Sequence, residues 1–91
     1  MQYKNENTEL FSKVLGKIID QICAEKNIIS ANRFADEYDI DDSNFNKIRK
    51  GKQNAKIVTI WKISEALGIK FSDFAKRLEE ELGEDFTLID R

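Results

Sequence analysis

Apolar side chains recur three and four positions apart along most of the chain, and this spacing is the period of an α-helix. The clearest example runs from Phe11 through Leu15 and Ile18 to Ile22. The chain contains no proline, so its helices must end at capping residues, at glycines, or where the apolar pattern stops. The pattern therefore predicts an all-α fold made of short helices that are separated by brief turns.

Capping residues and glycines divide this pattern into five segments, which suits one small domain of 91 residues. Ser, Thr and Asp are favoured at helix N-termini, and glycine is favoured just past the C-terminus. Residues 84–91 alternate weakly and are compatible with an extended segment. The expected helices run from Thr8 to near Lys26, over 31–38 after Ser30, over 42–50 between Asp41 and Gly51, over 57–67 before Gly68, and over 73–82 between Ser72 and Gly83.

The join between the second and third expected helices is the most specific part of the pattern. Two helices of about eight residues, separated by a turn of three to four residues, match a helix-turn-helix motif. Ala35 falls where two helices would cross closely and only a small side chain fits. Asp39 falls in the turn, where a left-handed backbone is expected. Ile40, Phe45 and Ile48 are then positioned to lock the pair of helices together.

Positive charge is concentrated in one stretch of an otherwise acidic chain. The net charge is −2, but residues 43–64 contain six Lys or Arg and no Asp or Glu, whereas the rest of the chain carries nine basic and seventeen acidic residues. A local basic patch decides which surface meets a polyanion. A solvated helix face is the alternative explanation, but it does not account for the absence of carboxylates from 43–64. The basic residues are Lys47, Arg49, Lys50, Lys52, Lys56 and Lys62.

Composition argues against several other classes of protein. Histidine is absent and Cys23 is the only cysteine, so the commonest general base is missing and no internal disulfide can form. With no phosphate-binding loop and no metal-ligand spacing, we expect neither an enzyme nor a bound metal or cofactor. No signal-peptide pattern and no apolar run of about 20 residues is present, so we expect a cytoplasmic protein without a membrane span. Cys23 itself is expected to be a small apolar core residue.

The stretch ISANRFADEYDIDDSNFNKIRKGKQNAKIVTIWKISEALG resembles the helix-turn-helix domain of the Cro/phage-repressor class, also called the XRE family. The resemblance implies a compact four-to-five-helix bundle, a lambda-repressor-like DNA-binding domain whose third helix enters the DNA major groove. Where this family commonly has a glutamate late in the third helix, the chain has Arg49. The resemblance runs without gaps from about Leu15 to Phe74, and its matching residues include Gly16, Ser30, Ala35, Ile48, Gly51, Lys52, Asn54, Thr59 and the Ala-Leu-Gly of 66–68.

The third helix indicates which side chains would face DNA. With Phe45 and Ile48 inward, a step of about 100° per residue puts Ser43, Lys47 and Lys50 on the opposite face. Lysine suits guanine, asparagine suits adenine, serine suits either, and an aspartate in the groove would accept from cytosine. Lysines and amides of the following loop suit phosphate oxygens. We therefore expect base contacts from Asp42, Ser43, Asn44, Asn46 and Lys47, and phosphate contacts from Lys50, Lys52, Gln53, Asn54 and Lys56.

Two apolar features lie outside this face. Trp61 would suit base stacking. However, it shares a helical stripe with Ile57, Ile60, Ser64 and Leu67, so packing in the core is expected. Beyond a DNA-binding domain expected over 1–78, an acidic C-terminal extension over 79–91 carries three large apolar side chains. These either fold back on the core or form a surface for self-association or for a second protein; they are Phe86, Leu88 and Ile89.

Two functions are consistent with these patterns. The first is a sequence-specific transcriptional regulator that binds double-stranded DNA, as a homodimer on a pseudo-palindromic site. The second is a protein-interaction module, an antitoxin-like or adaptor protein whose acidic segment 79–91 engages a basic partner. Within the family that the chain resembles, the two functions are compatible.

Overall fold

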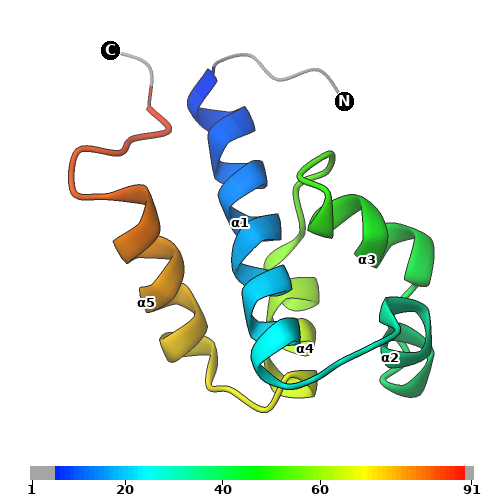
Figure 1. Cartoon of the computed structure of the whole chain (residues 1–91). Helices are drawn as coiled ribbons and strands as arrows, with labels where there is room; N and C mark the ends of the chain where they lie inside the picture. Colours follow the sequence, from blue (N-terminus) through cyan, green and yellow to red (C-terminus); the bar gives the residue numbers. More distant parts are fainter. Residues whose placement is uncertain (1–5, 90–91) are drawn as a thin grey trace.

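The computed structural model describes residues 6–89 and shows a bundle of five helices (Figure 1). No strand occurs within these residues. The all-α fold expected from the apolar spacing is thereby confirmed. The helices are α1 (Glu6–Glu25), α2 (Ala31–Glu37), α3 (Asp42–Arg49), α4 (Ile57–Ala66) and α5 (Phe71–Leu82).

The long helix α1 runs through the middle of the bundle, with α5 on one side and the α2–α3 pair on the other (Figure 1). Contacts join α1 to α3 and to α5, α2 to α3, and α4 to α5. The core lies where these faces meet, because each helix turns its apolar stripe inward. The buried apolar side chains are Leu15, Ile18, Ile19, Ile22, Cys23, Phe34, Ala35, Ile40, Phe45, Ile48, Ile63, Leu67 and Phe74.

The ends of α2 and α3 follow the capping signals of the sequence. Ser30 accepts a hydrogen bond through Oγ from the backbone N–H of Arg33, at 3.3 Å. Asp41 accepts one through Oδ1 from the backbone N–H of Asn44, at 2.8 Å. Gly51 follows α3 with φ 72°, the left-handed conformation that favours glycine past a helix end. The predicted caps of these two helices are therefore confirmed.

The first and last helices begin earlier than expected. α1 starts at Glu6, so Thr8 lies inside its first turn. α5 starts at Phe71 after an extended Lys70, so Ser72 also lies inside its helix. Acidic side chains in both first turns complement the helix dipoles. The N-cap positions predicted for Thr8 and Ser72 are therefore wrong.

The turn between α2 and α3 has the conformation expected of a helix-turn-helix motif. Asp39 has φ 57°, in the left-handed region that aspartate tolerates. The backbone N–H of Ile40 donates to the carbonyl of Ala35 at 2.7 Å and closes the turn. Ala35 is fully buried, as the close crossing of the two helices requires.

A second close crossing brings α1 against the C-terminal end of α3. A Cβ atom on Gly16 would lie 2.3 Å from the carbonyl oxygen of Arg49 and 2.8 Å from that of Ile48. Only glycine permits this approach, because a methyl group would collide with backbone atoms. Gly16 thus sets the distance between the central helix and the helix that carries the basic residues.

The outer side of α4 differs from the expectation. Its buried side chains are Ile63 and Ser64, while Trp61 is 55% exposed and Ile57 is 68% exposed. The core positions predicted for Trp61 and Ile57 are therefore wrong. The reason is that α4 turns one narrow face toward the core, and the rest of residues 6–89 leaves its other side uncovered.

The residues after α5 return toward the start of α1. The ring of Phe86 lies 6.2 Å from that of Phe11, measured between centroids. Leu88 and Ile89, which follow, are exposed. Of the two alternatives for these apolar side chains, Phe86 folds back on the bundle, while Leu88 and Ile89 do not.

The single cysteine is buried beside the core, as its apolar surroundings in the sequence predict. Burial raises the pKa of the Cys23 thiol; nearby Arg49 lowers it and Asp20 raises it. The neutral thiol is therefore favoured, and Cys23 acts as a small apolar side chain.

Candidate nucleic-acid interface

Helix α3 is held by two fully buried side chains on its inner face. Phe45 packs with its ring centroid 5.5 Å from that of Phe34 on α2, and Ile48 completes the inner face. On the opposite face, Ser43, Lys47 and Lys50 are all exposed. These three side chains point away from the core, as the helical spacing predicts.

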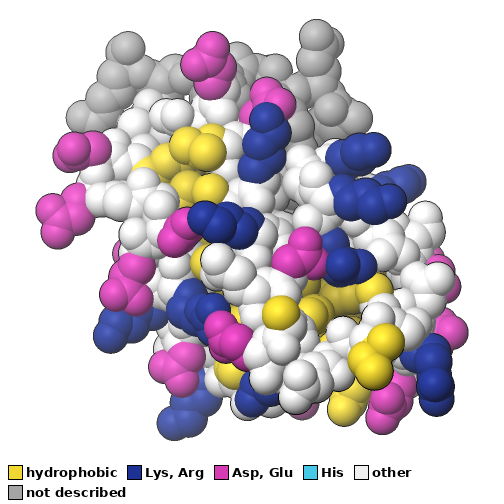
Figure 2. Space-filling model, viewed as in Figure 1, with side chains coloured by type: hydrophobic (Ala, Val, Ile, Leu, Met, Phe, Trp, Pro, Cys, Tyr) yellow, Lys and Arg dark blue, Asp and Glu magenta, His cyan; other side chains and the backbone are white. Residues whose placement is uncertain are grey.

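Positive side chains gather over the C-terminal half of α3 and the turn that follows, at the upper right of Figure 2. Lys47, Lys50, Lys52 and Lys56 are exposed there. Within residues 6–89 none of the four forms an ion pair with a carboxylate. Ammonium groups without an internal partner are available to neutralise phosphates. We call the surface formed by Ser43 and these four lysines the cationic face.

The other two basic residues of this stretch are used inside the protein. Arg49 donates through Nε to Oδ1 of Asp20 at 2.7 Å, which ties the end of α3 to α1. Lys62 donates through Nζ to the backbone carbonyl of Asp39 at 2.7 Å, which ties α4 to the helix-turn-helix turn. Of the six positive charges counted in the sequence, four therefore remain for an external anion.

Three amides among the predicted contact residues are half-buried and make hydrogen bonds within the protein. Gln53 donates through Nε2 to Oδ1 of Asn44 on α3. Asn54 accepts at Oδ1 from the hydroxyl of Ser12, which is buried on α1. These two bonds hold the loop after α3 against both helices. The amides therefore shape the loop as well as line it.

Asn46 lies within a chain of hydrogen bonds that the spacing did not reveal. It donates through Nδ2 to Oδ1 of Asn32 on α2 at 2.8 Å, and its own Oδ1 accepts from Nη1 of Arg49 at 3.1 Å. The Arg49 guanidinium also lies 5.9 Å from the centroid of the Phe45 ring. Sequence reasoning missed Arg49 and Asn32 as part of this site. The available signal was the positive charge of Arg49 at a position where a glutamate is common.

Two acidic residues stand at the start of α3, beside the cationic face. Asp41 is the N-cap, and the half-buried Asp42 lies in the first turn. Carboxylates at a helix N-terminus complement its dipole, so both have a structural role that requires no DNA. Asp42 is the only carboxylate among the predicted base contacts.

Comparison with known proteins identifies the family. The description of the Cro/C1-type HTH DNA-binding domain matches residues 18–80. The chain belongs to this Cro/C1-type family. Control protein C.MunI of Mycoplasma sp is 33% identical over 66 residues, which make up 72% of this chain and 89% of that protein. No solved structure matches the chain significantly.

Membership of the Cro/C1-type family makes the chain a DNA-binding transcriptional regulator. The match spans α2, α3 and α4, so it contains the helix-turn-helix motif and the whole cationic face. Among residues 6–89, no three His, Cys, Asp or Glu side chains are grouped so that they could hold a metal ion. In the same part of the chain, every helix is too short or too polar to cross a bilayer.

Away from the cationic face, this Cro/C1-type domain exposes a patch of large apolar side chains on α4. Ile57, Val58 and Trp61 form it, with Val58 74% exposed, and we call it the α4 apolar patch. The Trp61 ring stacks on Phe71 with centroids 5.4 Å apart and donates through Nε1 to Glu65 at 3.1 Å. The ring is thus held in place although it is exposed. Contiguous exposed apolar side chains of this kind mark interaction surfaces.

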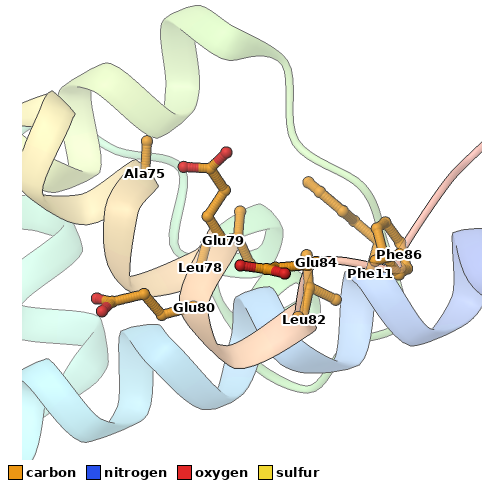
Figure 3. A pocket seen from close by; sticks show the side chains of 9 residues that line it. Phe11, Ala75, Leu78, Glu79, Glu80, Leu82, Glu84 and Phe86 are labelled. Carbon is orange, nitrogen blue, oxygen red and sulfur yellow. The ribbon is translucent and has the colours of Figure 1, made fainter.

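A second hollow surface, the C-terminal groove, lies between α1, α5 and the returning chain end (Figure 3). It has a volume of about 990 Å³. Apolar side chains and glutamates both line it, so the groove combines an apolar surface with negative charge. Its apolar members include Phe11, Leu78, Leu82 and Phe86, and its glutamates are Glu79, Glu80 and Glu84.

Proposed function

We propose that this regulator binds a specific sequence of double-stranded DNA as a homodimer, with α3 of each protomer in the major groove. The observation that carries the proposal is the cationic face, whose four lysines are exposed and unpaired within residues 6–89. A polyanion could bind there without breaking internal ion pairs. The related protein from Mycoplasma sp is named a control protein. By analogy, we propose that this chain controls gene expression, in the cytoplasm.

Contacts on the cationic face would divide by position along α3. Side chains in the first half of the helix and at its middle would meet base edges, whereas those at its end and in the next loop would meet phosphates. Lys47 is a long donor suited to guanine O6 and N7. The proposed base contacts are Asp42, Ser43, Asn44, Asn46 and Lys47, and the proposed phosphate contacts are Lys50, Lys52, Gln53, Asn54 and Lys56.

Selection from a random double-stranded DNA library tests the proposal. At low salt we expect one duplex sequence to be enriched, with two similar half-sites in inverted orientation. Its affinity should fall steeply as salt is added, with a slope of about −0.9 for each phosphate neutralised. If no sequence is enriched at low salt, the proposal of sequence-specific binding is rejected.

The α4 apolar patch supports the homodimer. A single small domain offers few phosphate contacts, and the net charge of −2 gives little general attraction to DNA. Two copies joined by a two-fold axis would double the contacts, provided that their α3 helices lie about 34 Å apart, one turn of the duplex. Burying the apolar side chains of α4 against the same side chains of a second copy would supply the association energy.

The double substitution Ile57→Asp and Val58→Asp is expected to abolish self-association. Both side chains are more than half exposed in the monomer, and aspartate suits the first turn of a helix, so the fold should be unaffected. Light scattering should give about twice the chain mass of 10.6 kDa for the natural protein and the chain mass for the variant. The matched control is Ile29→Asp, a fully exposed apolar residue outside the patch. A natural protein that stays at 10.6 kDa would exclude the dimer.

The C-terminal groove supports a second candidate function, the protein-interaction module. Its apolar floor suits the apolar side of an amphipathic segment, and Glu79, Glu80 and Glu84 suit Lys or Arg on the same segment. A second protein that presents a basic amphipathic helix would therefore fit this groove. Binding there would leave the cationic face accessible, so an antitoxin-like or adaptor role is compatible with DNA binding.

Charge reversal in the groove separates this candidate from the regulator alone. In Glu79→Lys with Glu84→Lys, a partner that co-purifies with the natural protein should no longer bind, because like charges would then face each other. Affinity for the selected duplex should stay within about twofold, since both residues are on the far side of α1 from α3. Asp73→Lys, at the other end of α5, is the control. Retention of the partner by the double variant would rule out the groove as its binding site.

A further inference from the structure

The two asparagines of α3 have their acceptor oxygens already in use. Oδ1 of Asn44 accepts from Nε2 of Gln53, and Oδ1 of Asn46 accepts from Nη1 of Arg49 at 3.1 Å. The Arg49 guanidinium is itself held by Asp20 at 2.7 Å, so its position does not depend on DNA. Each carboxamide is therefore oriented by a donor from the same protein. What remains directed outward is the N–H side of each amide.

The N–H groups are used less completely than the oxygens. An asparagine amide has two N–H donors, and Asn46 spends one on Oδ1 of Asn32 at 2.8 Å. No bond within residues 6–89 uses the Nδ2 donors of Asn44 or Asn32. Together with Lys47 and Lys50, these amides give the outer side of α3 many donors. Acceptors are few there, namely the carboxylate of Asp42 and the hydroxyl of Ser43.

This imbalance bears on which bases the helix can read. Adenine presents an acceptor at N7 and a donor at N6, so an asparagine that recognises adenine needs both its oxygen and its N–H. An adenine amino group that approached Oδ1 of Asn46 would meet an oxygen already bound to a guanidinium, donor against donor. Guanine presents two acceptors, N7 and O6, and neither requires an acceptor from the protein.

We propose that Arg49 and Gln53 are positioning residues that make the outer side of α3 a donor surface, which reads guanine acceptor edges and does not form asparagine–adenine pairs. The proposal rests on the proposed function, because it concerns the bases that α3 would meet. It specifies that Asn44 and Asn46 contact DNA as donors alone. It also places Asp20, on α1 and outside the interface, among the residues that determine specificity.

Base preferences of three proteins test the inference: the natural chain, Asn44→Ala and Asn46→Ala. Each is taken through the same selection from random duplexes, and each enriched site is scored position by position. The natural protein should favour guanine at the base pairs that α3 faces. Neither alanine variant should lose a preference for adenine at any position, because none depends on these amides. Loss of an adenine preference in either variant overturns the inference.

Arg49→Met tests the same inference as a gain of specificity. Methionine keeps much of the side-chain length but donates no hydrogen bond, so Oδ1 of Asn46 is released. Adenine should then be favoured at one base pair, by about tenfold relative to the natural protein. Lys76→Met removes the same charge from α5 and should leave every base preference unchanged. A profile for Arg49→Met equal to that of the natural protein overturns the inference.

The outcomes separate this inference from the proposed function. If the natural protein enriches no duplex, sequence-specific binding fails, and the inference fails with it. If it enriches a duplex whose adenines are read by Asn44 or Asn46, the proposed function stands and the inference alone fails. If circular dichroism shows that Arg49→Met does not fold, the two alanine variants decide, since alanine favours the helix.

Discussion

Replacing Lys47 and Lys50 together with alanine is expected to lower the affinity for the selected duplex by about a hundredfold. Both lysines are exposed on the cationic face and have no internal partner within residues 6–89, so each should contribute about tenfold by binding DNA. Titration of labelled duplex at several salt concentrations measures the effect. The salt slope should become shallower by about 0.9 for each phosphate that the variant no longer neutralises.

A second pair of lysines separates direct binding from overall charge. Lys70→Ala with Lys76→Ala removes the same two positive charges from α5 and the turn before it. Because exposed charges more than about 10 Å apart are largely screened at 0.1 M salt, this variant should bind nearly as well as the natural protein. Equal decreases in affinity for the two double variants would mean that net charge, and not the cationic face, governs binding.

Gly16→Ala is expected to lower the free energy of unfolding by about 3 kcal/mol. Helix propensity alone predicts the opposite, a gain of about 1 kcal/mol for alanine within a helix. The added methyl group, however, would stand 2.3 Å from the carbonyl oxygen of Arg49, so α1 and α3 must separate. Urea titration measures the free energy, and the melting temperature should fall by roughly 15 °C. DNA affinity should fall as well, because α1 would no longer support α3.

Gly68→Ala is the matched control for this substitution. Gly68 has φ 78°, so alanine there is strained, but the nearest atom to its Cβ is Nζ of Lys26, at 4.0 Å. The cost should be about 1–2 kcal/mol, that of a left-handed conformation alone. The order of the two variants tests the close approach of α1 and α3. A Gly16→Ala protein that is as stable as the natural one would show that the helices can separate at no cost.

Much of the fold could be predicted because its signals are local. Ser30 and Asp41 cap their helices through their own side chains, and Asp39 takes the left-handed turn that its short polar side chain permits. The inward direction of Phe45 and Ile48 follows from helical spacing alone. That spacing also fixes the outward direction of Lys47 and its neighbours. These features depend on residues a few positions apart, so no knowledge of the packing was needed.

The candidate site was only partly predictable from sequence. The spacing indicated which side chains face outward, but it did not separate paired from unpaired cations. Arg49 and Lys62 looked equivalent to the other basic residues, and each is in fact bonded to a residue more than twenty positions away. Likewise, the amide of Asn46 seemed available to a base until the packing of α1 and α2 showed its two partners. Such pairings depend on where helices meet, which periodicity does not encode.

Trp61 shows the same limit for the core. Its spacing on α4 was that of a buried residue, yet a helix buries only the face that another element covers, and Trp61 remains 55% exposed. The sequence by itself determined the helices, their caps, the helix-turn-helix turn and the direction of α3, since each follows from backbone geometry over one or two turns. Only the tertiary structure decided which charges remain free, which apolar side chains stay exposed, and why Gly16 admits no side chain. Those three depend on distances between helices, and such distances are set by packing.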